Sequence, residues 1–292
     1  MATTESAESF QIPTEAAEAY ESAFVPAFFA QWAPILCDAA GIGARQRVLD
    51  VACGTGIVAR TAAERVGAGR VVGVDLNQAM LTVARRVRSD IDWRQGDVAA
   101  LPLPGQSFDA VLCQMALMFF ADRIGALREM ARVAAPAGTV AVLVPASLGA
   151  QPTYGPFVDM ATRHAGREAR SLLNTYFACG DRNDLSSLFG RAGLHVTATS
   201  THAGTARFPS VDAFVDTELH STPLGERISA EVYGLIRHGA REILAPFTAA
   251  DGTLAAPFEV HVVTAAPASG LASKTDAGGA AELGRAPRGE DR

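Results

Sequence analysis

Residues 48–56, with the sequence VLDVACGTG, constrain the fold of this chain more than any other segment. A short apolar run leads into a turn with Gly54 and Gly56, and the pattern of residues 57–66 is that of a helix. Glycine adopts positive φ angles and lets the backbone approach a ligand closely, and the first turn of a helix has unbonded N–H groups. The segment therefore predicts a buried strand, a ligand-binding turn and a helix, as at the start of a nucleotide-binding α/β fold.

Strands and helices alternate on both sides of this turn. Short apolar runs that are regularly separated by helices are typical of a parallel sheet with both faces covered. Right-handed crossovers between such strands give a doubly wound, Rossmann-like α/β fold, which is the fold class we expect. The predicted strands are 47–52, 70–74, 91–95, 110–114 and 139–144, the predicted helices are 57–66, 78–89 and 125–133, and a turn is expected at 135–138.

The rest of the chain adds helices around this core. We expect one or two helices over 13–40, with Thr14 as the N-cap, and a helix over 181–193 that ends at Gly193. Mostly helical insertions at 147–180 and 209–247 precede strands at 194–200 and 259–265. The expected organisation is one domain over 13–267 with a core at 45–145, a helical cap from 13–40, 147–180 and 209–247, a flexible start at 1–12 and a disordered tail at 268–292.

Composition excludes several classes of partner. The formal net charge is −6, which argues against binding to a nucleic-acid backbone. The four cysteines are widely spaced without a CxxC pair, so we expect reduced thiols in a cytoplasmic protein and no metal site. No apolar run approaches the ~20 residues of a membrane span, so no membrane association is expected. A monomer and a homodimer both remain open.

The ligand of the glycine turn has two candidate classes. Gly54, Gly56 and Ala59 also fit the GxGxxG/A fingerprint of dinucleotide-binding proteins. Asp50, however, lies four residues before Gly54, and a carboxylate close to a pyrophosphate is repulsive. A cationic ligand is favoured instead, and S-adenosylmethionine carries an ammonium group and a sulfonium without any phosphate.

Two further acids follow the next two strands. Asp75 ends the second strand, where a carboxylate can accept hydrogen bonds from both ribose hydroxyls; a dinucleotide would use the same acid. Asp97 follows the third strand and could accept from an adenine amino group while the Val98 N–H donates to the ring. Three acids in this order favour an adenosyl ligand.

These stretches carry a family resemblance. VLDVACGTG, GVDLNQAML and GDVAALPLPGQSFDAVLCQ resemble the class I S-adenosylmethionine-dependent methyltransferases, and within them the group similar to ubiquinone/menaquinone-biosynthesis methyltransferases. The resemblance covers about residues 45–145. It implies the strand order 3-2-1-4-5-7-6 with the last-formed strand antiparallel. Ala52 departs slightly from the family, where many members have glycine.

The resemblance also implies a set of cofactor-binding residues. It implies Asp50 and Gly54 near the methionine end, Asp75 on the ribose, Leu76 and Met80 beside the adenine, Asp97 with Val98 at the adenine edge, and Gln114 between cofactor and substrate. The full predicted set is Tyr20, Asp50, Ala52, Cys53, Gly54, Gly56, Asp75, Leu76, Met80, Gly96, Asp97, Val98 and Gln114.

The substrate side is predicted from apolar residues outside the core motifs. Tyr20, Phe24 and Phe28 form one stripe of the N-terminal helix. This stripe either packs the helix on the domain or forms a lid, with Tyr20 at the methionine end of the cofactor. The predicted pocket residues are Phe24, Met115, Met118, Phe119, Tyr154 and Tyr176, and core packing is the alternative for each of them.

A catalytic base is not evident in the sequence. Methyl transfer is an in-line displacement from a sulfonium, so positioning and desolvation can supply much of the catalysis. The weak candidates for a base are His164, His202, His220 and His238. His261 lies in the last predicted strand and is expected to be structural.

The predicted function is methyl transfer from S-adenosylmethionine to an O, N or C atom of a small, hydrophobic or aromatic metabolite. One alternative is a protein of the same fold that binds the cofactor without methyl transfer, either a cyclase or a non-catalytic partner. The other is an NAD-dependent oxidoreductase, against which Asp50 and Asp97 argue. A methyltransferase acting on a macromolecule is disfavoured by the acidic balance of the chain.

Overall fold

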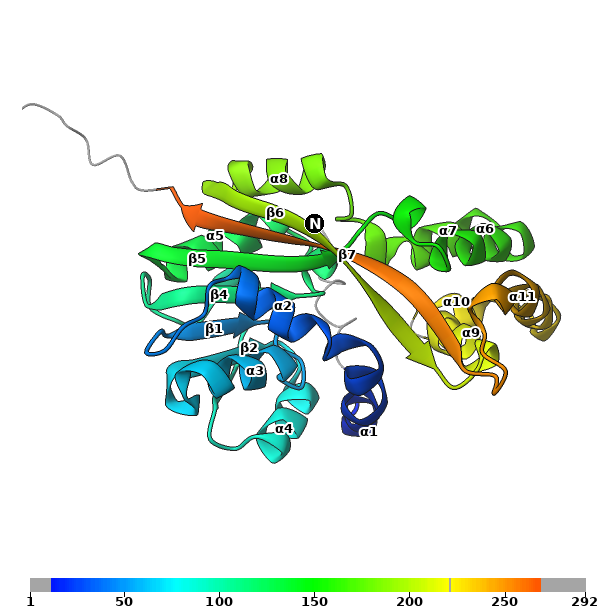
Figure 1. The fold of residues 1–292 in the computed structure, drawn as a ribbon, viewed down its shortest axis with the longest axis horizontal. Coiled ribbons are helices and arrows are strands. Elements are labelled where there is room, and N and C mark those ends of the chain that lie inside the picture. Colours follow the sequence, from blue (N-terminus) through cyan, green and yellow to red (C-terminus); the bar gives the residue numbers. More distant parts are fainter. Residues whose placement is uncertain (1–11, 221, 269–292) are drawn as a thin grey trace, which may run out of the picture.

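A computed structural model of the chain, which describes residues 12–220 and 222–268, contains a seven-stranded sheet with the order β3-β2-β1-β4-β5-β7-β6 (Figure 1). This order confirms the sequence prediction. Strands β1 to β5 pair in parallel, and β7 is antiparallel to both β5 and β6. The strands are β1 Val48–Val51, β2 Val71–Asp75, β3 Asp92–Gln95, β4 Phe108–Gln114, β5 Ala134–Pro145, β6 Leu194–Phe208 and β7 Leu254–Pro267.

Helices cover both faces of the sheet, and four of them connect or follow its strands. They are α3 Ile57–Val66, α4 Gln78–Val87, α5 Arg123–Val133 and α8 Arg182–Arg191. Local capping fixes the start of three of them, because Asn77, Asp122 and Asp181 each accept a hydrogen bond from a backbone N–H in the first turn. The chain moves from β1 toward one edge of the sheet, to β2, and from β4 toward the other edge, to β5. Right-handed crossovers therefore place α3 and α5 on opposite faces of the sheet.

The fifth strand begins earlier than predicted. The turn expected at 135–138 falls inside β5, which is a correction to the sequence prediction. Phe108 pairs with Ala134, whereas Ala110 pairs with Thr139, so the register shifts while the chain passes through Pro136. The turn-like composition produces an irregularity within a paired strand and does not end the strand.

The N-terminal segment consists of α1 Thr14–Ala19, the π-helix η2 Tyr20–Phe29 and α2 Trp32–Ala39. Pro13 occupies the N-cap position of α1 without a side-chain hydrogen bond, so the prediction of Thr14 as the N-cap is wrong. Pro26 lies inside η2, has no N–H group and crowds the carbonyl four residues earlier. The backbone relieves this conflict by widening, and the Ala30 N–H bonds to the Val25 carbonyl five residues back.

Strands β6 and β7 extend well beyond the core of the sheet as a long antiparallel pair. The pairing continues from His202 opposite Val260 to Phe208 opposite Leu254, past the ends predicted from the sequence. The cap helices gather around this extension at one end of the sheet (Figure 1). They are α6 Tyr154–Ala165, α7 Arg167–Leu173, α9 Val211–His220, α10 Leu224–Arg227 and α11 Ala230–Ile243.

A single cluster of buried apolar side chains connects the sheet with the cap. It contains Leu49 and Val111 of the central strands as well as Phe157 of α6 and Ile236 of α11. Among the described residues, no helix is both long and apolar enough to cross a membrane.

Candidate active site

The glycine turn between β1 and α3 depends on positive φ angles. Ala52, Gly54 and Gly56 have φ angles of 53°, 55° and 89°. A Cβ atom on Gly56 would lie 2.1 Å from the indole ring of Trp93, which also packs against Gly73. Glycine at position 56 is therefore required both by the backbone conformation and by the close approach of Trp93.

Asp75 joins the carboxyl ends of β1 and β2. Its Oδ2 accepts a hydrogen bond from the Gly54 N–H at 2.8 Å, and its Oδ1 accepts one from the Asn77 N–H at 2.8 Å. Burial raises the pKa of this carboxyl above its usual value, while the N–H donors act in the opposite direction. The acid predicted for the ribose and the predicted glycine turn thus lie in direct contact.

Asp50 is more deeply buried than the sequence argument assumed. It is 1% exposed, and its Oδ2 accepts a hydrogen bond at 2.9 Å from the Ala59 N–H in the first turn of α3. Burial raises the pKa of the Asp50 carboxyl to about 8, so the structure disfavours a negative charge there at neutral pH. Its role toward a ligand stays a prediction, and its visible role is to satisfy the start of α3.

The residues predicted at the adenine edge follow β2 and β3. Asp97 is exposed and is the N-cap of the short helix η4 Val98–Ala100. Its Oδ1 accepts a hydrogen bond from the Ala99 N–H at 2.9 Å. The Leu76 carbonyl accepts from the Gln95 side chain at 3.1 Å, which links the ends of the two strands. Gly96 is close to Pro102, since a Cβ atom there would lie 2.7 Å from the proline ring. Leu76, Met80, Gly96 and Val98 are half-buried, whereas Asp97 is exposed.

The N-terminal segment closes over the glycine turn. A carbon of the Tyr20 ring lies 3.9 Å from the Cβ position of Gly54. Burial raises the pKa of Tyr20 well above its usual value, with further contributions from the nearby carboxyls of Asp75 and Asp50. The structure therefore brings Tyr20 to the turn, and its contact with a cofactor stays a prediction.

Ion pairs hold this segment in place. Arg60 of α3 pairs with Glu21 at 2.9 Å and donates to the Thr55 carbonyl in the turn at 2.6 Å. Glu18 pairs with Arg86 of α4. We call residues 14–30, which carry these contacts, the lid. Arg60 was missed by the sequence analysis, because its partner lies 39 residues away and no local pattern marks the pair.

Two buried polar atoms at the site lack a hydrogen-bond partner among the described residues: Thr55 Oγ1 and Gln114 Oε1. The Gln114 Nε2 donates to the Phe29 carbonyl of the lid at 3.2 Å, so this side chain lies between β4 and the lid. Unsatisfied buried polar atoms are rare in folded proteins and are expected where a polar ligand binds. Together with the carboxylates and the turn glycines, these atoms fit a ligand with many donors, such as an adenosyl amino acid. Cys53 is buried beside the same turn.

The predicted pocket residues include two aromatic groups, one that follows β4 and one on the lid. In one group, Phe119 packs edge-on against Tyr176 at 5.6 Å, next to buried Met118. Met115 is buried and has a φ angle of 55°, which turns the chain sharply after β4. In the other group, Phe24 stacks on Tyr20 at 6.2 Å.

Tyr154 is connected to the turn through an aromatic series, which we define as Tyr20, Phe29, Phe28, Phe258 and Tyr154. Successive ring centroids in this order lie 5.0, 5.0, 4.8 and 5.3 Å apart. The predicted stripe of Tyr20, Phe24 and Phe28 is changed by the π-helix, which brings Phe29 against Tyr20.

The candidate histidines lie on the cap and on β6. His164, His220 and His238 are exposed on α6, α9 and α11, and His202 bonds to Ser200 at 2.8 Å. The hydrogen bonds and ion pairs of these histidines in the described part of the chain lie within the cap and β6, and their catalytic role stays a prediction. His261 is buried and bonds to Thr201 at 2.9 Å, in line with a structural role. Among residues 12–220 and 222–268, no group of three or more His, Cys, Asp or Glu side chains could hold a metal ion.

Comparison with known proteins agrees with this geometry. Residues 49–142 match the family model of a methyltransferase domain. The chain is 39% identical over 145 residues to a demethylmenaquinone methyltransferase of Renibacterium salmoninarum, which covers 49% of this chain and 58% of that protein. It is 32% identical over 180 residues to the ubiquinone/menaquinone biosynthesis C-methyltransferase UbiE of Hahella chejuensis, which covers 56% of this chain and 72% of that protein.

The fold is shared with solved structures of low sequence identity. The YcgJ protein of Bacillus subtilis aligns with a TM-score of 0.53 and 19% identity, and the alignment covers 81% of this chain and 97% of that one. The chain spans only about half the length of several curated relatives. The sheet order, the glycine turn with Asp75 and the similarity across most of the Hahella protein together establish that this chain belongs to the class I S-adenosylmethionine-dependent methyltransferases.

Proposed function

We propose that this chain transfers a methyl group from S-adenosylmethionine to a small, hydrophobic metabolite with an aromatic or quinone-like ring. The observation that carries the proposal is the direct contact of Asp75 with the Gly54 turn, beneath a lid that brings Tyr20 to the same point. The relatives named as quinone methyltransferases support a ring-bearing substrate. They do not favour the non-methylating alternative or the oxidoreductase.

The cofactor would be held by residues from the ends of three strands. Asp75 and the Gly54 turn would hold the ribose and the amino acid part, while Leu76, Met80, Asp97 and Val98 would enclose the adenine. When bound, S-adenosylmethionine supplies an electrophilic methyl group on a cationic sulfur.

The chain's own residues supply positioning and exclusion of water. The lid covers the turn with Tyr20, and Gln114 ties the end of β4 to Phe29 of the lid. Buried Met118, with Phe119 and Tyr176, provides an apolar wall against which a flat ring can be oriented. Water is thereby kept from the reacting atoms.

The proposal also covers the compartment and the class of binding partner. The cysteines are all free and buried, which supports a reducing compartment such as the cytoplasm. We propose a small molecule as the partner and assign no oligomeric state.

Binding is tested with S-adenosylhomocysteine and the variant Asp75→Asn. We expect calorimetry to show at least tenfold weaker binding by the variant, since a charge-assisted hydrogen bond contributes about 1.5–3 kcal/mol. The matched control is Asp92→Asn, because Asp92 is an exposed acid of neighbouring β3 that pairs with Arg94. Equal affinities of both variants and the wild type would overturn the site.

The reaction is tested by product mass. The protein is incubated with S-adenosylmethionine and a panel of naphthols, hydroquinones and other hydroxylated aromatic compounds. A gain of one CH2 unit in a panel compound supports methyl transfer. Binding of S-adenosylhomocysteine without any methylated product would favour the non-methylating alternative.

A further inference from the structure

Helix α9 carries a carboxyl group at a position where its pattern calls for an apolar side chain. The buried stripe of the helix consists of Val211, Phe214, Val215, Glu218 and Leu219. Glu218 is 8% exposed and lies in the middle of the cap. A buried carboxyl costs free energy that an apolar side chain of similar size would not, so its presence on this stripe requires a reason.

The carboxyl is paired with the aromatic series. Glu218 Oε1 accepts a hydrogen bond at 3.1 Å from the hydroxyl of Tyr154, the last member of that series. The Tyr154 ring is surrounded by the rings of Phe177, Phe214 and Phe258 at 5.6, 5.2 and 5.3 Å. The pair therefore lies within aromatic walls that come from α6, α9, β7 and the short helix η7 Thr175–Phe177.

Ring contacts connect this pair with the lid. The aromatic series leads from Tyr154 through Phe258 and Phe28 to the lid residues at the glycine turn. Burial and the Glu218 carboxyl raise the pKa of Tyr154 well above its usual value, and the Tyr176 phenol, which packs against Phe119 after β4, adds to this shift. Burial raises the pKa of Glu218 to about 7, so near neutral pH its carboxyl can both donate and accept a hydrogen bond.

We propose that Tyr154 and Glu218 form the polar end of the substrate pocket and bind a hydroxyl group carried by an otherwise apolar, aromatic substrate. The assignment rests on the proposed function, and it adds the feature of the substrate that the site selects. Apolar walls discriminate weakly among ring compounds, whereas a hydrogen bond from the pair to a substrate hydroxyl is lost with an analogue that lacks the hydroxyl.

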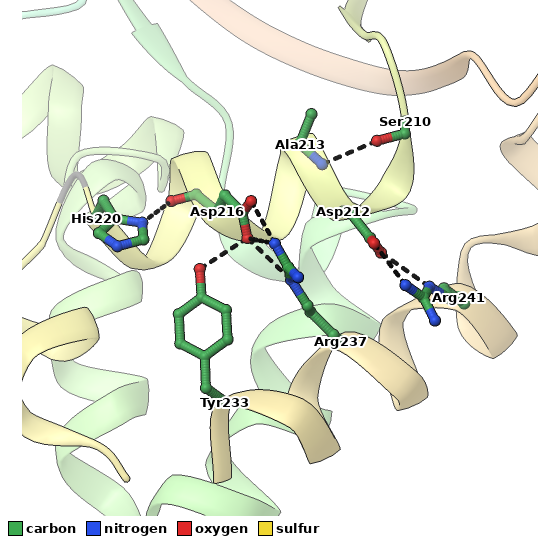
Figure 2. A network of polar contacts seen from close by, with 8 residues as sticks. All are labelled: Ser210, Asp212, Ala213, Asp216, His220, Tyr233, Arg237 and Arg241. Carbon is green, nitrogen blue, oxygen red and sulfur yellow. Dashed lines mark hydrogen bonds and ion pairs between the residues drawn. The ribbon is translucent and has the colours of Figure 1, made fainter. Parts of the chain in front are cut away.

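The chain offers a matched control on the same helix. Asp216 of α9 also accepts a hydrogen bond from a tyrosine hydroxyl, that of Tyr233 on α11, at 2.7 Å. Figure 2 shows Tyr233 and Arg237 meeting at this carboxylate, with Asp212 and Arg241 paired beside it. The Asp216 side chain is 39% exposed, so the same chemical pair there lies outside the aromatic walls.

The experiment compares 1-naphthol with 1-methoxynaphthalene, which differ by one hydroxyl hydrogen and a methyl group. Binding of each to the full chain saturated with S-adenosylhomocysteine is measured by titration calorimetry. We expect the wild type to prefer 1-naphthol by at least tenfold. Tyr154→Phe and Glu218→Leu should reduce this preference to less than threefold, while Tyr233→Phe and Asp216→Asn should retain it.

Stability separates recognition from a structural role. We expect Glu218→Leu to melt at the same temperature as the wild type or higher, because leucine completes the apolar stripe of α9. A large loss of stability in Glu218→Leu would show that the pair holds the cap together, and that result would overturn the proposal. The proposal would also be overturned if the wild type showed no preference for 1-naphthol, or if the preference survived in both Tyr154→Phe and Glu218→Leu.

Saturation with S-adenosylhomocysteine is confirmed separately by the thermal shift that it produces. Failure to bind it would contradict the proposed function. Normal binding of it without the hydroxyl preference would contradict only the assignment of Tyr154 and Glu218.

Discussion

Gly56 and Gly252 have nearly the same backbone angle but different surroundings. Their φ angles are 89° and 88°, so an added side chain is strained at both. At Gly56 the new Cβ would also meet Trp93 at 2.1 Å, whereas nothing lies within 4 Å of that position at Gly252. We expect Gly56→Ala to lower the free energy of unfolding by about 2–4 kcal/mol and Gly252→Ala by about 1 kcal/mol. Urea denaturation measures both.

A second change tests the cause of this difference. Trp93→Phe leaves more space above Gly56, so the cost of Gly56→Ala should fall when the two changes are combined. If the two glycine variants were equally stable, the contact of Trp93 with the turn would not explain why residue 56 is glycine.

Single residues also show where sequence reasoning reached its limit. Asp75 and Gly54 could be paired from the sequence because each follows a predicted strand, and the carboxyl ends of parallel strands meet at one edge of a sheet. Asp50 was assigned a charge facing a ligand, yet it lies 1% exposed behind the first turn of α3, and burial favours its neutral form. The depth of a side chain depends on what packs over it, which the local pattern does not contain. Glu218 had a local signal, its place among apolar residues of α9, that became informative only once Tyr154 was known to face it.

At the scale of elements, the lid is held by two ion pairs of different burial. The side chains of Arg60 and Glu21 are 13% and 20% exposed, and Arg60 also reaches the Thr55 carbonyl of the turn. Arg86 and Glu18 are more than twice as exposed. Exposed pairs contribute little because water and salt screen them.

We therefore expect the two glutamates to affect ligand release unequally. Glu21→Gln should increase the dissociation rate of S-adenosylhomocysteine about 3- to 10-fold, since a contribution near 1 kcal/mol corresponds to about a fivefold change. Glu18→Gln should change it less than twofold. Stopped-flow displacement measures both rates at the same ionic strength. Equal rates in the two variants would mean that Arg60 does not hold the lid.

The elements that were predicted least well are those with non-local causes. The helix over 57–66 was predicted with its observed bounds because its apolar period and its glycine turn are local. Strand β6 continues to Phe208, eight residues past the predicted end, through the mostly small residues of the sequence THAGTARF. Its pairing with residues 254–261 is what makes this segment a strand. Gly204 lies against Trp32 of α2, with a Cβ position 2.3 Å from the ring, so the extension is also shaped by the N-terminal segment.

At the scale of the whole molecule, the sheet order followed from the family resemblance, and the cap was predicted only as helical segments. What the sequence could not supply is how the cap joins the core. The structure joins them through Phe28 and Trp32 from the N-terminal segment, Phe258 from β7 and Tyr154 from α6. The buried apolar cluster runs without a break from the central strands into α11.

This continuity predicts a single cooperative unfolding transition. The chain has two tryptophans, of which Trp32 reports on the junction with the cap and Trp93 on the glycine turn. Fluorescence of the variants Trp93→Phe and Trp32→Phe follows each tryptophan separately during urea denaturation. In each variant, the transition seen by tryptophan fluorescence should coincide with the transition seen by far-UV circular dichroism. A transition at Trp32 that precedes the one at Trp93 would mean that the cap unfolds by itself. In that case the lid and the polar end of the pocket would form only when the cap docks, and substrate affinity would fall with the first transition while the sheet remained folded.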